Sequence, residues 1–383
     1  MKIMKLVSWL GILMCGIIFQ GMSQVNNEML FQEIEMKDSI ENTVLLSIQS
    51  RNVFKNNEYF HDITSGYTLM GTQWYSSLAF QLNAHLRVQA GVFLQQDFGN
   101  DGLKKVAPMF TVKYAENGYA VLFGALEGNV SHRMIDPILN YERYILHPLE
   151  NGVQIKADKK LLWMDNWMNW EKMQYLGDSI QEQFTIGHSS LWHVIHQPKL
   201  NLDIPVQLMA THRGGQIDID TTALQTVINA AVGVNVSIPA RGFFTSVFSE
   251  NYVCLFNDFS PTSRLPYQNG YSYFMNLGAK TKYDITASLG YWNAYQYYAS
   301  RGGELFQSVS SKYAPAPYLS PNRSLLFVRF MYQHKLLNHL YTDIRFEPYY
   351  DLGHSFFEYS YGCYLTYKND FGIINLTKRK KTF

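Results

Sequence analysis

The sequence has few cysteines, few charged residues and no excess of either charge. Only three of its 383 residues are cysteine, and two of them, Cys254 and Cys363, lie beyond residue 24, so we expect no disulfide framework. Lys and Arg number 32 against 31 Asp and Glu, a net charge of +1 that provides no positive field for nucleic acid. Charged residues make up 16% of the chain, below the roughly 25% usual in soluble domains.

Long apolar runs are also scarce. Beyond the first twenty residues, no window supplies the ~20 apolar residues that a membrane-spanning helix needs, which excludes a helical membrane protein. Aromatic residues, in contrast, reach 15%, with 27 Tyr and 24 Phe. Because Tyr, Phe and Val favour strands, the composition predicts an all-β protein.

The start of the chain has the features of a secretory signal peptide, which we expect to span residues 1–24. Two lysines precede the apolar stretch Leu6–Phe19, and the small residues of Gly21–Ser23 suit cleavage. An anchor helix and a lipoprotein cysteine at Cys15 are weaker alternatives. Residues 25–42 are polar and acidic without alternation, and we expect them to form a short N-terminal leader.

From residue 43 onward, apolar and polar residues alternate with period two, which is typical of strands with one apolar and one polar face. The longer runs hold roughly 11 to 17 residues. Soluble strands usually hold about 5–6 residues, whereas a tilted membrane-spanning strand needs about 9–11. The clearest alternating runs are residues 84–95, 200–211, 224–238, 271–279, 285–291, 340–347 and 357–367.

Turn-forming residues separate these runs. Short turns are expected at 116–118, 336–338 and 368–370, and long polar loops at 257–269 and 299–322. Short turns at one end and long loops at the other are the layout of an outer-membrane barrel. We therefore predict one antiparallel up-and-down transmembrane β-barrel over residues 43–383, with about 14 strands and a range of 12–16.

With these features, the chain resembles porin-like outer-membrane β-barrel proteins of Gram-negative bacteria from residue 43 to its end. The resemblance implies location in the outer membrane, contact with membrane lipid, and passage of polar small solutes, plausibly saccharides, with a homo-oligomer as an option. Such proteins often end in an aromatic residue, as Phe383 does. The chain departs from their pattern at Lys381 and Arg379, where apolar residues are expected.

The polar faces of the strands predict which charged residues line the lumen. Charge on the lipid face is costly, so charged residues of alternating runs should point inward. Mixed charges along a wet pore would select polar solutes. The predicted pore-lining residues are Arg87, Asp203, Arg329, Asp343, Arg345 and Glu347.

Residues 128–198 break the alternating rhythm, and we expect them to form a helical or irregular insert that narrows the lumen. Within this range, Trp163, Trp167 and Trp170 have helical i, i+4, i+7 spacing. Their indole rings could stack on sugars at a constriction, although ordinary packing explains such a stripe equally well.

The same range contains the candidates for chemistry. His193 and His196 are too few to hold zinc, so no metal and no cofactor are expected. The architecture also resembles that of outer-membrane phospholipases, which use a serine–histidine–polar arrangement, and His188-Ser189-Ser190 with His193 could supply these roles. Sequence alone assigns no catalytic residue, because a triad is defined by geometry. A barrel enzyme acting on lipid or glycan, and a secreted soluble β-protein that binds glycans, therefore remain alternatives to the channel.

Overall fold

The computed structural model describes residues 27–376 except 216, 218 and 313–316. Sixteen mostly two-faced segments form strands there, and five short helical turns precede or connect them. The strands are β1 (Thr43–Glu58), β2 (Tyr67–Gln81), β3 (Leu86–Asp97), β4 (Lys105–Glu116), β5 (Tyr119–Ala125), β6 (Asn151–Lys159), β7 (Leu162–Lys172), β8 (Gln183–Gln197), β9 (Leu200–Arg213), β10 (Gln225–Pro239), β11 (Phe244–Asp258), β12 (Asn269–Thr281), β13 (Ile285–Tyr295), β14 (Asn322–Leu337), β15 (Leu340–Asp351) and β16 (Phe356–Asn375). The helical turns are η1 (Glu28–Leu30), η2 (Asp38–Ile40), η3 (Asn129–His132), α2 (Arg143–Leu146) and η4 (Glu304–Phe306).

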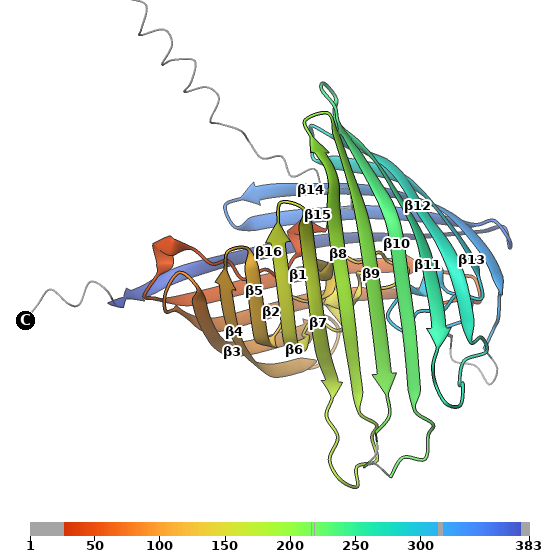
Figure 1. Cartoon of the computed structure of the whole chain (residues 1–383), viewed down its shortest axis with the longest axis horizontal. Helices are drawn as coiled ribbons and strands as arrows, with labels where there is room; N and C mark the ends of the chain where they lie inside the picture. The colour runs from red at the N-terminus through yellow and green to blue at the C-terminus, as the bar shows by residue number, and fades with distance from the viewer. Residues whose placement is uncertain (1–26, 216, 218, 313–316, 377–383) are drawn as a thin grey trace, which may run out of the picture.

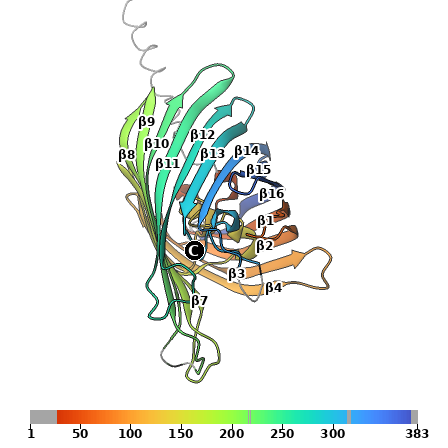
Figure 2. The ribbon, with the colours of Figure 1, turned by 90° about the vertical axis from the view of Figure 1, so that its right-hand side faces the viewer.

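Each strand pairs antiparallel with its neighbours in sequence, and β16 pairs with β1, so the sheet closes into a barrel (Figures 1 and 2). Closure leaves no unpaired strand edge, which is what lets a sheet cross a membrane. The prediction of an all-β antiparallel barrel is confirmed. The predicted number of about 14 strands is too low. The described part of the chain has 16 strands, which is the upper end of the predicted range. In the same part of the chain, no helix is long and apolar enough to cross a membrane.

The connections differ at the two ends of the barrel. At one end, here called the turn end, the connections include 117–118, 160–161, 198–199 and 338–339. At the other, the loop end, they include the long segments 126–150 and 296–321. The turns predicted near 117 and 338 are present. The turn predicted at 368–370 is wrong, because these residues pair with Ser47–Gln49 of β1 inside a continuous strand.

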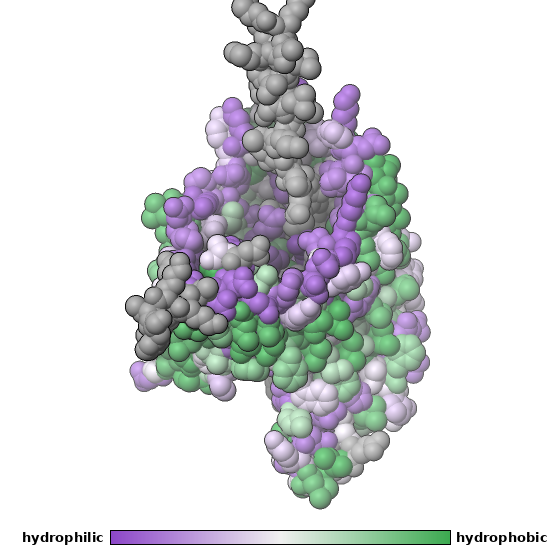
Figure 3. All heavy atoms as spheres, turned by 60° about the vertical axis from the view of Figure 1, so that its left-hand side comes forward, coloured by the Kyte–Doolittle hydropathy of each residue, from purple (hydrophilic) through white to green (hydrophobic). Residues whose placement is uncertain are grey.

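The outer surface carries the apolar face of the strands. Figure 3 shows a band of hydrophobic side chains below a hydrophilic rim that surrounds the hollow of the barrel. In β10 the exposed residues include Val232 and Val234 on the outer face, whereas Asn229 and Asn235 face the lumen and are buried. Because the period of a strand is two, one face meets the surroundings and the other meets the lumen.

This assignment predicts the effect of a charge on the outer face. Val232→Arg should lower the yield of folded barrel in membranes, because an arginine at mid-depth on the lipid face costs about 2–4 kcal/mol. Leu176→Arg, in the exposed loop between β7 and β8, is the control and should assemble normally. The yield of folded barrel for both variants is measured from the change in electrophoretic mobility that a folded barrel shows on heating. Equal yields of the two variants would contradict the assigned lipid face.

Two segments of the chain occupy much of the lumen. The N-terminal segment (27–40) runs along the inner wall, where the backbone of Gln32 donates to Ser131 Oγ and that of Ile34 to Glu127 Oε1, both at 2.8 Å. The lumen segment (126–150) folds inward from the loop end and shares an apolar core with Trp292, Leu305 and Phe306 of the opposite side. Residues 25–42 were predicted as a polar leader, but the part described here packs Leu30 and Phe31 into the barrel interior.

The predicted insert at 128–198 has to be corrected. The irregular part is mainly residues 126–150, with η3 and α2 as short helical turns, whereas residues 151–197 contain β6, β7 and β8 and the loop 173–182 between β7 and β8. The predicted helix through Trp163, Trp167 and Trp170 is wrong, since all three lie in β7. The spacing of Trp163 and Trp167 does not distinguish the two structures, because residues four apart share one face in a strand as well as in a helix. Residues 1–24, the expected signal peptide, and Phe383 lie outside the described residues.

Candidate functional site on the outer face of the barrel

The six charged residues predicted to line a pore all face the lumen, where each is buried. Arg87 on β3 contacts Asp370 at 2.7 Å and the backbone oxygen of Glu35 at 3.1 Å. Asp203 on β9 accepts a hydrogen bond from His193 Nδ1 at 2.6 Å. The lumen-facing side chains of β14 and β15 complete the set, namely Arg329, Asp343, Arg345 and Glu347.

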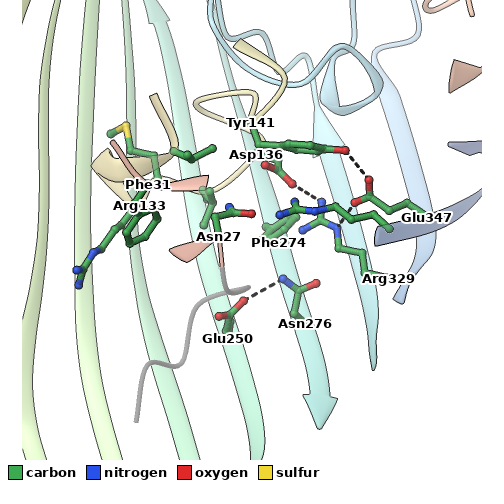
Figure 4. A pocket seen from close by; sticks show the side chains of 14 residues that line it. Asn27, Phe31, Arg133, Asp136, Tyr141, Glu250, Phe274, Asn276, Arg329 and Glu347 are labelled. Carbon is green, nitrogen blue, oxygen red and sulfur yellow. Dashed lines mark hydrogen bonds and ion pairs between the residues drawn. The ribbon is translucent and has the colours of Figure 1, made fainter. Parts of the chain in front are cut away.

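These four residues are occupied by one another and by the lumen segment. Arg329 bridges Asp136 and Glu347, with 3.0 Å from its Nε to Glu347 Oε1, and Figure 4 shows it between the two carboxylates. Tyr141 donates to Glu347 Oε2 at 2.7 Å. Arg345 pairs with Asp343 at 2.6 Å. The network therefore ties the lumen segment to the wall, and its charges are largely neutralised within the fold.

The space left between these groups is small. A cavity of about 40 Å³ lies between the N-terminal segment, the lumen segment and the β11–β15 wall, bounded by residues that include Asn27, Phe31, Arg133 and Glu250 (Figure 4). Arg133 lies 4.3 Å from the ring centroid of Trp163 and 5.4 Å from that of Phe31, so it joins both inner segments to β7. A cavity of this size has room for a few water molecules and no large solute.

The three tryptophans predicted at a constriction do not form one group. Trp163 and Trp167 face the lumen and are buried, whereas Trp170 is on the outer face. Trp170 stacks on Phe184 with 5.3 Å between ring centroids. The structure thus brings two of the three rings into the lumen and places the third in the lipid-facing band.

A buried cluster around His132 attaches the lumen segment to β7. The ring of His132 lies 2.8 Å from Glu150 Oε2 and 2.9 Å from Asp165 Oδ2, and it stacks on Trp167 at 3.5 Å with planes 5° apart. Gln154 donates to both oxygens of Asp165, at 3.0 and 2.9 Å. We call these five residues the His132 cluster. Burial of the ring by itself lowers its pKa, but the two carboxylates outweigh burial and raise the pKa of His132 to about 9.

The shifted pKa predicts a pH-dependent stability. A histidine whose pKa is raised on folding stabilises the protein fully below its unfolded value near 6.5, and this contribution is lost as pH rises through about 9. We expect the barrel to lose about 3 kcal/mol between pH 6.5 and 9.5. Urea unfolding followed by tryptophan fluorescence measures this loss. The control is His132→Gln, in which the decline over this pH window should be absent; an unchanged decline would contradict the assignment.

A different arrangement lies on the opposite face of the same strands. In β7, alternation places Asp165 and Trp167 in the lumen and Asn166 outside. In β8, the exposed Ile186 and Trp192 show that even-numbered residues face outward, and these include His188 and Ser190. The register of the two strands sets Asn166 directly opposite His188.

Ser190, His188 and Asn166 are joined by hydrogen bonds, and we call them the outer triad. His188 Nδ1 lies 2.8 Å from Asn166 Oδ1, and His188 Nε2 lies 3.0 Å from Ser190 Oγ. Because the amide oxygen accepts, Nδ1 carries the proton and Nε2 presents its lone pair to the serine hydroxyl. This is the serine–histidine–polar arrangement of a nucleophile activated by a general base.

The surroundings of the outer triad are apolar. Along β8 it lies between the aromatic Phe184, toward the loop end, and Trp192, toward the turn end. The serine is only 3% exposed, with Met164 and Val206 at the register positions on either side of it. The serine is thus largely covered in this conformation, and a reactant arriving from the lipid side would have to displace neighbouring side chains, a movement to which methionine is well suited.

The sequence contained only part of this site. His188-Ser189-Ser190 was a candidate, and its two outward residues, His188 and Ser190, belong to the outer triad. His193, the other candidate, faces the lumen and pairs with Asp203. Asn166 was missed, because nothing in the sequence connects it to His188, 22 positions away. The described residues contain no group of three or more His, Cys, Asp or Glu that could hold a metal ion.

A closed barrel with a hydrophobic outer band and a hydrogen-bonded Ser–His–Asn triad on that band defines an outer-membrane β-barrel with a candidate lipid-facing site. Residues 34–376 match the model of a protein family described as lipid A 3'-O-deacylase-type, and the chain belongs to this family. A search of curated proteins gave no match.

Solved structures share the barrel fold. The outer membrane protein OprD of Pseudomonas aeruginosa is 9% identical with a TM-score of 0.50, and the match covers 86% of this chain and 94% of that chain. A loop-deletion mutant of the Vibrio cholerae outer membrane protein OmpT is 12% identical with a TM-score of 0.49, covering 85% and 99%. OccAB4 of Acinetobacter baumannii is 10% identical with a TM-score of 0.47, covering 88% and 100%. The likeness to OprD supports the porin-like outer-membrane fold.

Proposed function

We propose that the chain is an outer-membrane esterase that removes an ester-linked acyl chain from lipid A. The observation that carries this proposal is the hydrogen-bonded chain from Ser190 through His188 to Asn166 on the lipid-facing surface. Membership of the lipid A 3'-O-deacylase-type family independently supports the same reaction class.

The reaction follows from the roles of the three groups. Ser190 Oγ gives its proton to His188 Nε2 and attacks the ester carbonyl carbon, forming a new C–O bond. When the tetrahedral intermediate collapses, the bond to the sugar oxygen breaks and His188 returns the proton to that oxygen. Water then attacks the acyl-serine by the same route, releasing the fatty acid and restoring the hydroxyl. Asn166 Oδ1 accepts a hydrogen bond from His188 Nδ1–H throughout, which keeps the imidazole in the required tautomer.

The position of the triad supports a lipid as the substrate. Its neighbours on the outer face are apolar or aromatic, and Ile186 and Trp192 are exposed on either side of it along β8. A soluble ester in the lumen would meet Ser189, which faces inward, and not Ser190. Membrane lipid is therefore both the surroundings of the barrel and the source of its substrate in this proposal.

Passage of polar solutes, the first prediction from the sequence, has less support. The N-terminal segment and the lumen segment occupy the interior, and Arg329, Arg345, Asp343 and Glu347 are engaged in ion pairs. We therefore expect little steady conductance while these segments are in place.

Two measurements on the same preparation test the proposed function. Full-length protein purified from membranes should release free fatty acid from lipid A in detergent micelles, measured by mass spectrometry. The same protein in planar bilayers should show little steady conductance. Large, stable conductance without acyl release would overturn the enzyme and favour the channel.

A further inference from the structure

We propose that His132, inside the lumen, is a positioning residue that holds Asn166 in line with His188 on the other side of the barrel wall. This inference rests on the proposed function. It concerns how a site on the lipid face, where polar contacts are few, keeps its geometry.

The argument begins with β7. Asn166 lies between Asp165 and Trp167 in sequence, and the side chains of these two neighbours point into the lumen. Because successive residues of a strand point to opposite faces, fixing the two neighbours fixes the backbone from which the Asn166 side chain extends.

One side chain contacts both neighbours. His132 donates from Nδ1 to Asp165 Oδ2 at 2.9 Å, and its ring stacks on Trp167 with 3.5 Å between centroids. The ring is held on its other edge by Glu150 at 2.8 Å. His132 and Asp165 are both completely buried, so water does not compete for these contacts.

Trp167 also packs against β8, the strand that carries His188 and Ser190. Gly187, the residue before His188, lies opposite Trp167 in the register. A Cβ at Gly187 would lie 2.1 Å from the indole ring, so the indole occupies the space above this glycine. Trp167 thus packs against β8 next to His188 while His132 covers its other face.

The outer face offers Asn166 less support. The hydrogen bond found for its side-chain amide among the described residues is the one with His188. The placement of the Asn166 side chain therefore depends largely on the backbone of β7, which is held by its pairing with β6 and β8 and by the lumen contacts of Asp165 and Trp167. A misplacement of about 1 Å can lower the rate of a reaction about 100-fold.

The experiment measures kcat and KM of the full-length protein in detergent micelles with the p-nitrophenyl ester of palmitic acid as probe. His132→Ala should lower kcat roughly 10- to 100-fold and leave KM within about twofold. Arg323→Ala is the matched control, because it breaks a lumen pair of equal burial, 3.0 Å from Asp351, on strands remote from the triad. It should keep kcat within about threefold.

A double-mutant cycle shows whether His132 acts through Asn166. In an Asn166→Ala background, His132→Ala should change kcat by less than about threefold, because the positioned group is already absent. A wild-type kcat for His132→Ala, or losses that multiply in the double variant, would overturn the inference. Should His132→Ala fail to assemble, Gln154→Ala removes one donor to Asp165 and should give a smaller loss with the same non-additivity.

Ser190→Ala separates this inference from the proposed function. If Ser190→Ala keeps full activity, the proposed function fails and the inference fails with it. If Ser190→Ala is inactive while His132→Ala is fully active, only the positioning role is wrong.

Discussion

Ser190→Ala should abolish acyl release, lowering kcat by roughly 10⁴- to 10⁶-fold, because the variant has no nucleophile. His188→Ala should lose a similar factor, since the hydroxyl then has no base within reach. The two losses should not multiply in the double variant, because the residues act as one unit. Release of fatty acid from lipid A, followed by mass spectrometry, measures all three variants.

The chain supplies matched controls on the same strand, β8. Ser189→Ala changes the adjacent serine, which faces the lumen, and His193→Ala changes the histidine that pairs with Asp203 inside the barrel. Both should keep activity within about threefold. If Ser189→Ala were inactive and Ser190→Ala active, β8 would present the opposite face to the lipid, and the site described here would be wrong.

Asn166→Ala should lower kcat roughly 10²- to 10⁴-fold with little change in KM. The loss of the amide oxygen removes the acceptor for the Nδ1 proton of His188, so the imidazole is no longer held in the tautomer that presents Nε2 to Ser190. Burst-phase and steady-state rates with the p-nitrophenyl palmitate probe measure the change.

Rescue distinguishes positioning from simple structural damage. Asn166→Asp retains an oxygen acceptor and should recover at least tenfold over Asn166→Ala. Met168→Ala, the next outward position of β7, is the control and should remain near wild type. Equal activities of the Ala and Asp variants would exclude the proposed role of the Asn166 oxygen.

The sequence by itself determined the all-β class and, where the alternation is clear, the lipid face of the strands, because a period of two is a local property of an extended chain. It underestimated the strand number because β5, with seven residues, and β6, with nine, are short, and β6 to β8 lie in a range without clear alternation. The tryptophans of β7 show the same limit. Trp163 and Trp167 share a face in either a helix or a strand, and only the strand sends Trp170 to the other side.

Tertiary structure alone decided the contents of the lumen and the composition of the site. The N-terminal segment carries no pattern that predicts an interior position, because its contacts are with residues such as Glu127 and Ser131, far away in the chain. The spacing of His188 and Ser190 put both on one face, but the third member comes from β7 through the strand register. Hydrogen bonds between strands depend on how the sheet closes, and closure is a property of all sixteen described strands together.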